Sequence, residues 1–496
     1  MGNLLGYAIL VLYSILLGTI AYLVLKKYPV NGKTTDEFVL AGKNVPFGLL
    51  APSVFVSWIW VTTIVGSAEA GVIYGISGGW AYSIGAIIAF GILIVILVKI
   101  RRLMPEGVTF MDFAGVRFST LVKDAYFMLA ILVVIYLSVE QAAGIALVFH
   151  GLFDISFKKI AFFTVMIAGA YVITVGMRGV LYNELINFFL ISLGFIIFAV
   201  VIVNKFDMAT LFDGLKDVQS NPKNNNYNPD ALHLLSKSGI MYALSAVVIA
   251  LGQICLDPAY YFKAHIAKDE KTMIRSFVFG GIAFWTPVAI ISSFVIGYVA
   301  LSKDINLESV INRSIAISTS ILQTDFGPGI QLLFAALVFI IGITSIIHGL
   351  IGIQSIFTMG YYKDKIKPEA TEAEQIKFGR TVTFLVATLC ALVAISLEKV
   401  SLLTIDTFSG IFFAATCGGI FAGFWSGKIL GNKVLVSIVI GILAGIAAWI
   451  KIEDTNIDWL YGSVISFGLP ILFLGLMSLL TSKKFNFAKL IHLGLK

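Results

Sequence analysis

Charged residues are scarce in this sequence, and their scarcity excludes an ordinary water-soluble protein. Lys, Arg, Asp and Glu make up 13% of the 496 residues, while 58% of the residues are apolar. Soluble proteins carry about twice that charged share and a smaller apolar share. The mean hydropathy is +0.95, and the apolar residues form runs of about 20 between short polar stretches, which is typical of membrane-spanning helices. The sequence therefore predicts an all-α polytopic membrane protein.

Cysteine and histidine are also rare, which argues against disulfides and bound transition metals. Cys255, Cys390 and Cys417 lie in apolar runs without CxxC spacing, and the five histidines lack metal-ligand spacing. The HExxH motif of zinc hydrolases and the P-loop motif of nucleotide-driven pumps do not occur. We expect no enzyme, no primary pump, no cofactor and no nucleic-acid partner.

Thirteen apolar runs are long enough to cross a bilayer, and the first is too long for a signal-peptide core. They cover approximately residues 4–25, 46–74, 78–98, 125–149, 159–177, 180–203, 238–261, 274–301, 329–360, 379–397, 402–427, 433–450 and 459–481. We expect each run to be helical, because unpaired backbone groups are too costly in hydrocarbon.

The positive charges predict the orientation. If the N-terminus lies outside, the cytoplasmic segments hold 25 of the 35 Lys and Arg residues, and such an excess is typical of cytoplasmic loops. We therefore expect a multi-pass plasma-membrane protein, a monomer or loose dimer in the bilayer, with its C-terminus in the cytoplasm. The longest polar loop, 204–237, then lies outside.

Spans two to six and spans seven to eleven form two sets of five with opposite orientation. Each set opens with a span that contains helix-breaking or polar residues. These are Pro52, Ser57, Thr62, Thr63 and Gly66 in span two, and Gly252, Gln253, Asp257 and Pro258 in span seven. Paired broken helices at corresponding places indicate a transporter binding site at mid-membrane.

Several motifs resemble those of one transporter family. Residues 257–269, Asp-Pro-Ala-Tyr-Tyr-Phe-Lys-Ala-His-Ile-Ala-Lys-Asp, are similar to the Asp-x-x-x-Tyr-x-Arg-x-x-x-Ala-Lys-Asp loop of the sodium/solute symporter family. The segments that resemble its other motifs are Phe38-x-x-Ala-Gly-Lys43, Tyr182-Asn183-Glu184 in place of Trp-Thr-Asp, and Thr344-Ser345 with Ser355 and Gly360-Tyr-Tyr-Lys363. Within the family, Trp58-Ile-Trp60-Val-Thr-Thr63 resembles the urea/polyamine permease branch.

This resemblance implies a LeuT-like fold, a five-plus-five inverted repeat with one leading and two trailing helices, which matches the thirteen spans. The expected divisions are a leading helix and loop (1–45), the first repeat (46–204), an outer loop (205–237), the second repeat (238–428) and the trailing helices (429–496). The implied function is sodium-driven symport of a small polar solute by alternating access. The solute class stays open among urea- or polyamine-like compounds, amino acids and sugars.

The resemblance also implies a sodium site between spans two and nine. By position, its ligands would be the backbone carbonyls of Val56, Ile59 and Ile341 and the hydroxyls of Thr344 and Ser345. Hard oxygen atoms of this kind suit sodium inside a membrane. Alternatively, the two hydroxyls only bond back to their own helix.

Some family members bind a second sodium with further hydroxyls and the acid of Trp-Thr-Asp. Here the hydroxyl positions are Ile347 and His348, and the acid is Glu184, so we expect the second sodium site to be absent. His348 would replace that ion, either as a partner of Glu184 or as a titrating group that couples protons. The alternative is a neutral histidine that hydrogen-bonds between helices.

Acidic residues within spans are costly and therefore functional candidates. Glu140 lies in the middle of span four, and the span centres supply no Lys or Arg to pair with it. We expect Glu140 either to be protonated, in a hydrogen bond between helices, or to face a watery cavity or a cationic solute. Asp257 and Lys263 are expected to form a structural clamp or part of the inner gate.

The substrate pocket is expected where span two meets spans four, seven and eleven. Its aromatic, amide, hydroxyl and acidic candidates are Trp60, Thr63, Tyr82, Glu140, Gln141, Gln253, Thr407 and Ser409. Aromatic walls with a few polar groups suit a small neutral or cationic solute, although each aromatic ring alone is also explained by packing. A proton-coupled symporter using Glu184 and His348, a passive solute channel and a membrane sensor stay open as alternatives.

Overall fold

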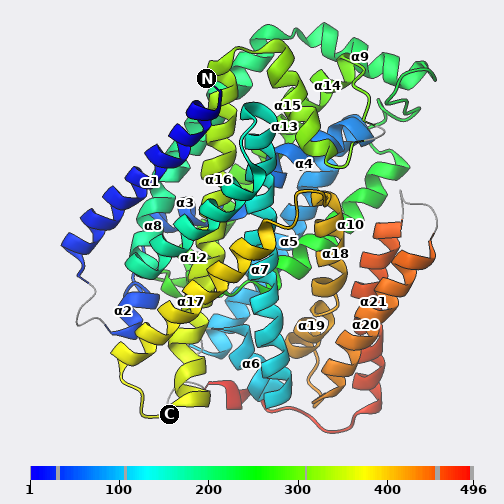
Figure 1. Cartoon of the computed structure of the whole chain (residues 1–496). Coiled ribbons are helices and arrows are strands. Elements are labelled where there is room, and N and C mark those ends of the chain that lie inside the picture. The colour runs from blue at the N-terminus through cyan, green and yellow to red at the C-terminus, as the bar shows by residue number, and fades with distance from the viewer. Residues whose placement is uncertain (1, 30–33, 106–108, 308–309, 453–457, 492–496) are drawn as a thin grey trace.

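The computed structural model describes residues 2–29, 34–105, 109–307, 310–452 and 458–491 (Figure 1). Within these ranges the regular structure is helical, and β pairing is limited to the isolated bridges Val45–Ala267 and Lys428–Lys484. Eleven of the described helices are long and apolar enough to cross a membrane, and a bent pair of shorter helices adds a twelfth span. The predicted all-α polytopic class is confirmed.

The helices that build the bundle have the following bounds. They are α1 (Gly2–Lys27), α2 (Thr35–Val39), α3 (Phe47–Trp58), α4 (Val61–Tyr74), α5 (Ile76–Leu103), α6 (Phe110–Arg117), α7 (Thr120–Phe153), α8 (Phe157–Lys205), α9 (Met208–Ser220), α10 (Lys237–Leu256), α11 (Pro258–Ile266), α12 (Glu270–Val278), η1 (Phe279–Phe284), α13 (Trp285–Ser292), η2 (Ser293–Tyr298), α14 (Val299–Ser302), α15 (Arg313–Asp325), α16 (Pro328–Ile356), η3 (Phe357–Ile366), α17 (Glu372–Ala394), α18 (Leu402–Ala414), α19 (Cys417–Trp425), α20 (Lys433–Lys451), α21 (Asp458–Leu480) and η4 (Phe487–Leu490).

The 49-residue helix α8 is two spans joined at a glycine. A straight helix of that length would extend ~74 Å, more than twice the thickness of the hydrocarbon core. Gly176 interrupts it with φ 65° and ψ −169°, a backbone conformation that side chains with a Cβ disfavour. A Cβ at Gly176 would also lie 2.7 Å from the ring of Phe38. With its two arms counted separately, the described spans number thirteen, as predicted.

The two spans that carry helix-breaking residues are both broken. Between α3 and α4, Ile59 and Trp60 adopt extended conformations, and the two half-helices are bent by 53°. Between α10 and α11, Asp257 is extended and Pro258 occupies the first position of the new helix, where proline is well tolerated.

The span from α12 to α14 packs along both halves of the first broken helix. It contains two wide π-helical segments, η1 and η2, of which η1 packs on α3 and η2 on α4. At Gly280 of η1, a Cβ would lie 2.5 Å from the carbonyl oxygen of Ala51. The two backbones are therefore in direct contact.

Two segments expected to be loops contain helices. In the long polar loop, α9 is capped by the side chain of Asp207 and buries Leu211, Leu215 and Val218 on one face. The segment between spans eight and nine contains α15. Short amphipathic helices of this kind give a weaker hydropathy signal than a span does.

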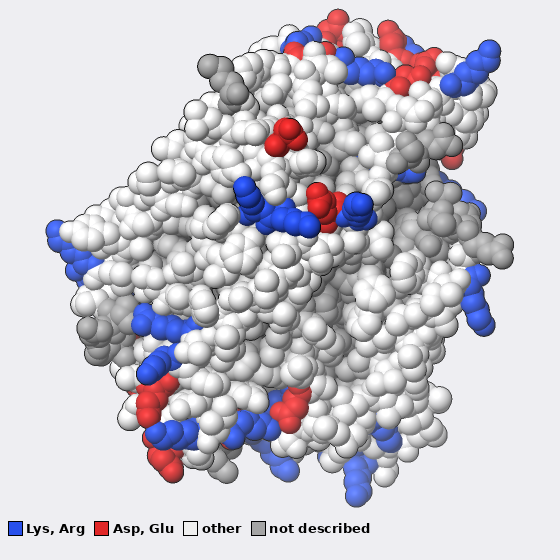
Figure 2. All heavy atoms as spheres, in the orientation of Figure 1, with Lys and Arg blue, Asp and Glu red and all other residues white. Residues whose placement is uncertain are grey.

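The two ends of the bundle carry different elements. We call the end with α9 the α9 face and the end with α6 and η4 the tail face; the N-terminus lies toward the first and the C-terminus toward the second (Figure 1). On the surface in Figure 2, charged side chains gather toward the upper and lower ends and in one group across the middle of this face, and the surface around that group is largely uncharged. The uncharged areas are consistent with contact with lipid.

Replacing Gly176 with Ala is expected to destabilise the protein, because a backbone with φ 65° and ψ −169° costs about 1–3 kcal/mol in a residue with a Cβ and the new methyl group would meet Phe38. The melting temperature of the detergent-solubilised protein should fall. Gly91→Ala is the matched control, since a Cβ at Gly91 in α5 meets nothing within 4 Å. Equal melting temperatures for the two variants would contradict this account of the kink.

Candidate functional site

The break between α3 and α4 releases backbone carbonyls from helical hydrogen bonding. The amide of Trp60 donates to Thr63 Oγ1 at 2.9 Å, and the amide of Val61 donates to Gln141 Oε1 at 2.8 Å. In a continuous helix these two amides would donate to the carbonyls of Val56 and Ser57. Two side chains therefore hold the break open.

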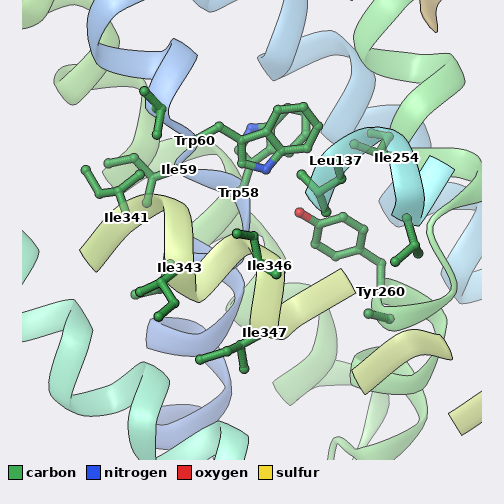
Figure 3. Packing of buried hydrophobic residues seen from close by; sticks show 14 of the residues in the cluster. Trp58, Ile59, Trp60, Leu137, Ile254, Tyr260, Ile341, Ile343, Ile346 and Ile347 are labelled. Atoms are coloured by element: carbon green, nitrogen blue, oxygen red, sulfur yellow. The ribbon is translucent and has the colours of Figure 1, made fainter. Parts of the chain in front are cut away.

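Ser345 of α16 lies against one of the released carbonyls. Its Oγ is 3.1 Å from the carbonyl oxygen of Ile59 and 3.0 Å from that of Ile341. Figure 3 shows Ile59 and Ile341 close together where the broken span meets α16. A hydroxyl carries one hydrogen, so it cannot satisfy both carbonyls fully. Three of the five predicted sodium ligands are thus brought together.

The other two predicted ligands differ in their surroundings. Val56 is buried beside the break, and its carbonyl accepts no hydrogen bond from Trp60 or from any side chain that the structure describes. Thr344 Oγ1 instead accepts from Asn187 Nδ2 at 2.7 Å and donates to the carbonyl of its own helix at Ile340, at 2.6 Å. For Thr344 the arrangement matches the alternative of a bond back to its helix.

Asn187 is a residue that the sequence reasoning missed. Its amide also donates to the hydroxyl of Tyr13 at 2.7 Å, so it joins α8 to both α1 and α16. A signal was present, since Asn187 is an amide that follows Glu184 by three residues and precedes a long apolar run.

Glu184 is paired with a lysine inside the protein. Lys263 Nζ lies 2.7 Å from Glu184 Oε1 and 3.1 Å from the carbonyl oxygen of Ser53, and Ser53 Oγ donates to Glu184 Oε2 at 2.5 Å. Both charged side chains are completely buried. The Glu184–Lys263 pair was not predicted from the sequence, because span seven was predicted to end at residue 261, whereas α11 continues it inward and carries Lys263 with it.

His348 does not pair with Glu184. Its Nε2 is 2.9 Å from Asp257 Oδ2, while Asp257 Oδ1 accepts from the amide of Ala259 and caps α11. The His348 Nδ1 atom is buried and has no hydrogen-bond partner among the described residues. The expected His348–Glu184 pair is wrong, and so is a direct Asp257–Lys263 clamp: α11 directs Asp257 to α16 and Lys263 to α8.

A cavity of about 580 Å³ extends from the loop after α9 to the helix break. It is lined by Trp58, Trp60, Thr62, Thr63, Gly66, Glu69, Ala70, Ile73, Tyr74, Tyr82, Ala86, Tyr227, Asn228, Pro229, Ser238, Met241, Tyr242, Ala246, Ile249, Ala250, Gln253, Trp285, Arg313, Ser314, Leu402, Asp406, Trp459 and Leu460. Its volume is that of a small-molecule site.

Four of the predicted substrate residues line this cavity: Trp60, Thr63, Tyr82 and Gln253. Ser409 lies just behind it, with its Oγ 3.0 Å from Gln253 Nε2. The side chain of Thr407 lies outside the described residues. Glu140 and Gln141 do not line the cavity, so their predicted contact with the solute is not found in this conformation.

Glu140 and Gln141 are buried on α7 instead. Gln141 is occupied at the helix break, where it accepts from the amide of Val61. Gln141 Nε2 lies 3.3 Å from Glu140 Oε2, and Glu140 Oε1 has no partner among the described residues. The structure places Glu140 away from water, which fits the expected protonated state.

A polar network that includes an acid lies at one end of the cavity. We call this end the floor; its network consists of Tyr136, Gln253, Asp406 and Ser409. Asp406 Oδ1 accepts from Tyr136 OH at 2.6 Å and from Gln253 Nε2 at 2.9 Å. Indole rings pack beside this floor: Trp60 lies 5.5 Å from Trp58 and 6.4 Å from Tyr136 between ring centres. Figure 3 shows the two tryptophans at the break. Asp406 was the recognisable signal here, as an acid in an apolar span.

Removing one partner of the Glu184–Lys263 pair is expected to be strongly destabilising. Lys263→Met should cost about 3–5 kcal/mol, because it leaves Glu184 buried without its cation. The Lys263→Met, Glu184→Gln double variant should recover much of the loss, as measured by thermal unfolding in detergent. Lys123→Met is the control, since its partners Asp112 and Asp364 are partly exposed. A double variant less stable than Lys263→Met would show that the two residues do not act as a pair.

Known proteins resemble this chain in sequence and in fold. Relatives include a probable urea active transporter from Schizosaccharomyces pombe, 23% identical over 94% of this chain and 74% of the relative. Another is a urea-proton symporter from Oryza sativa subsp. japonica, 20% identical over 75% of this chain and 55% of the relative. The chain thus spans between about half and three quarters of these proteins' length. These relatives are transporters, not enzymes, and they match the predicted urea branch.

The fold matches that of a solved transporter. A Na⁺-coupled sialic acid symporter, in a substrate-bound outward-open state, superimposes with a TM-score of 0.74 at 17% identity, covering 96% of this chain and 98% of that chain. This likeness confirms the predicted five-plus-five fold. A family model for the sodium:solute symporter family matches residues 38–441. Because this match spans most of the sequence, the chain belongs to the sodium:solute symporter family, as its motifs predicted.

Proposed function

We propose that this chain is a secondary active transporter that uses sodium entry to drive uptake of a small polar solute by alternating access. One observation carries the proposal: the cavity ends at the same helix break where Ser345 Oγ lies within 3.1 Å of the Ile59 and Ile341 carbonyl oxygens. A cation bound there would hold the broken span against α16. Whether a cation is bound at this site then affects the shape of the solute cavity.

The proposed sodium ligands are the carbonyls of Val56, Ile59 and Ile341 and the hydroxyl of Ser345. They are hard, neutral oxygens, which suit a monovalent cation in a low-dielectric environment. Thr344 completes the set only if its hydroxyl leaves Asn187, so in this conformation it serves as a support for α16. Water from the cavity can supply the remaining ligand.

The cavity is proposed to face the outside of the cell. The α9 face is the external face according to the distribution of Lys and Arg, which places the N-terminus outside and the C-terminus in the cytoplasm of a plasma-membrane protein. Toward the tail face, Tyr260, Lys263 and Asp257 are buried beneath the break. We assign these residues to the closed inner gate.

The relatives' printed names suggest urea-like solutes. The cavity supports a compound of that size and polarity, because indole rings and a few amide, hydroxyl and carboxylate groups line it. A passive channel would carry the same solutes, but its transport would not respond to a sodium or proton gradient.

Proton coupling is a second candidate, supported by the buried pair of His348 and Asp257. An imidazole can bind a proton, and this one touches both the inner-gate helix α11 and Asp257 at its start, while it belongs to the helix that carries Ser345. One relative is named a urea-proton symporter. In this alternative His348 binds the proton, and Glu184 stays neutralised by Lys263.

Ser345→Ala is expected to weaken sodium dependence without unfolding the protein. In proteoliposomes with an inward sodium gradient, the sodium concentration for half-maximal uptake should rise at least about tenfold, the effect of losing about 1.4 kcal/mol of binding free energy. Sodium should also lose its stabilising effect on the purified variant. Ser355→Ala is the control, because Ser355 sits on the same helix but only bonds back to Ile351. Unchanged sodium dependence in Ser345→Ala would refute the assigned site.

His348→Ser separates the two coupling ions. If sodium alone drives transport, the pH profile of uptake should keep its shape in the variant. A profile that rises toward low external pH in the wild type, and becomes flat in His348→Ser, would favour proton coupling instead. Uptake should be measured under separate sodium and proton gradients.

A further inference from the structure

The amide of Gln253 has a defined orientation at the cavity floor. Its Nε2 lies 2.8 Å from Tyr136 OH, 2.9 Å from Asp406 Oδ1 and 3.0 Å from Ser409 Oγ. Tyr136 gives its hydroxyl hydrogen to Asp406 Oδ1, and Ser409 gives its own to the Asp406 carbonyl. All three neighbours can therefore only accept, so the atom between them is the amide nitrogen.

This orientation leaves two acceptor oxygens on the floor. With its nitrogen committed to the network, Gln253 has Oε1 left over, and that atom accepts no hydrogen bond from the described residues. Asp406 has Oδ2 left over in the same way. Both residues line the cavity. The floor thus offers a solute two neighbouring acceptors, with the hydrogens of Gln253, Tyr136 and Ser409 already used.

The floor also carries a carboxyl group without a neighbouring cation. Burial opposes ionisation of Asp406, while the 2.6 Å bond from Tyr136 and the amide of Gln253 stabilise its ionised form, as a bound cation would. Glu140, the other acid near Tyr136, makes one long bond to Gln141 and is suited to stay protonated. Among the described cavity-lining residues, Arg313 is the only Lys or Arg, and it lies at the α15 end next to Glu69.

We propose that Asp406 and Gln253 are specificity-determining residues that bind two N–H groups carried by one carbon of the solute. Because one of these acceptors is a carboxylate, a guanidinium- or amidinium-type cation binds more tightly than urea. The indole ring of Trp60 lies beside the same floor and favours a flat cation over its face. This inference rests on the proposed transport function and names the solute chemistry of that site.

The binding of guanidinium and urea to the purified protein tests the proposed specificity directly. Radiolabelled guanidinium and urea are measured in scintillation proximity assays, with tetramethylurea and proline as competitors. We expect guanidinium to bind more tightly than urea. Tetramethylurea has no N–H group and proline carries a carboxylate, so neither should compete. Weaker guanidinium than urea binding, or effective competition by tetramethylurea, would overturn the proposal without any variant.

Asp406→Asn tests the carboxylate. The Asn oxygen would keep the bonds from Tyr136 and Gln253, so its amide hydrogens would replace the free acceptor in the cavity. Guanidinium, which has no acceptor, should bind at least about tenfold more weakly, as for the loss of a hydrogen bond to a charged group. Urea can turn its carbonyl toward the new donor and should lose less. Equal losses for both solutes would contradict the assigned role.

Two controls separate a local effect from misfolding and from failure of the proposed function. Glu398→Gln removes an exposed acid eight residues before Asp406 and outside the cavity lining, and guanidinium binding should not change. Asp406→Asn should keep sodium-dependent thermal stabilisation, because Ser345 is untouched. Sodium stabilisation without guanidinium binding in the wild type would reject this inference alone. Absence of sodium-dependent stabilisation and of sodium-driven uptake in the wild type would instead reject the proposed sodium-driven transport.

Discussion

The need to satisfy backbone polar groups within a membrane determines this structure. Hydrocarbon supplies no hydrogen bonds. A helix can therefore break there only where other groups bond the amides and carbonyls that the break leaves unpaired. At the break between α3 and α4, Thr63 and Gln141 bind the released amides, while Trp60, Trp285 and Ser345 donate to released carbonyls. These contacts draw α4, α7, α13 and α16 to one point, and the cavity ends there. The position of the site thus follows from the break.

Features that depend on local sequence could be predicted, and those that depend on distant packing could not. Hydropathy gave the thirteen spans, and Pro52 and the Asp257–Pro258 pair marked the broken ones, because these signals act within one segment. The partners of Glu184 and His348 were assigned wrongly, since pairing depends on how α8, α11 and α16 pack. Lys263 seemed to belong to a loop because the hydropathy of span seven ends before it. Gln141 was expected to contact the solute, but its Oε1 atom accepts the hydrogen bond from the Val61 amide at the break.

The region between the break and the tail face is closed by buried ionic and polar contacts as well as by apolar packing. Lys263 joins α11 to Glu184 of α8 and to the Ser53 carbonyl of α3, while Asp257 joins the same short helix to His348 of α16. Buried charges are tolerable only when each has a partner. Any movement of α11 that opened this region would have to break both contacts or carry the partners along. Each of these contacts has one specific partner, whereas apolar contacts can exchange partners. Paired contacts of this kind therefore favour two distinct states of a gate.

Three of the seven tryptophans, Trp58, Trp60 and Trp285, meet at the break, and the Trp285 indole donates to the carbonyl of Trp58. Indole emission shifts in colour and intensity with the polarity around the ring. The emission of these three rings therefore depends on the polarity at the helix break. Without any attached dye, the light emitted by the unmodified chain carries information on whether water has reached its centre.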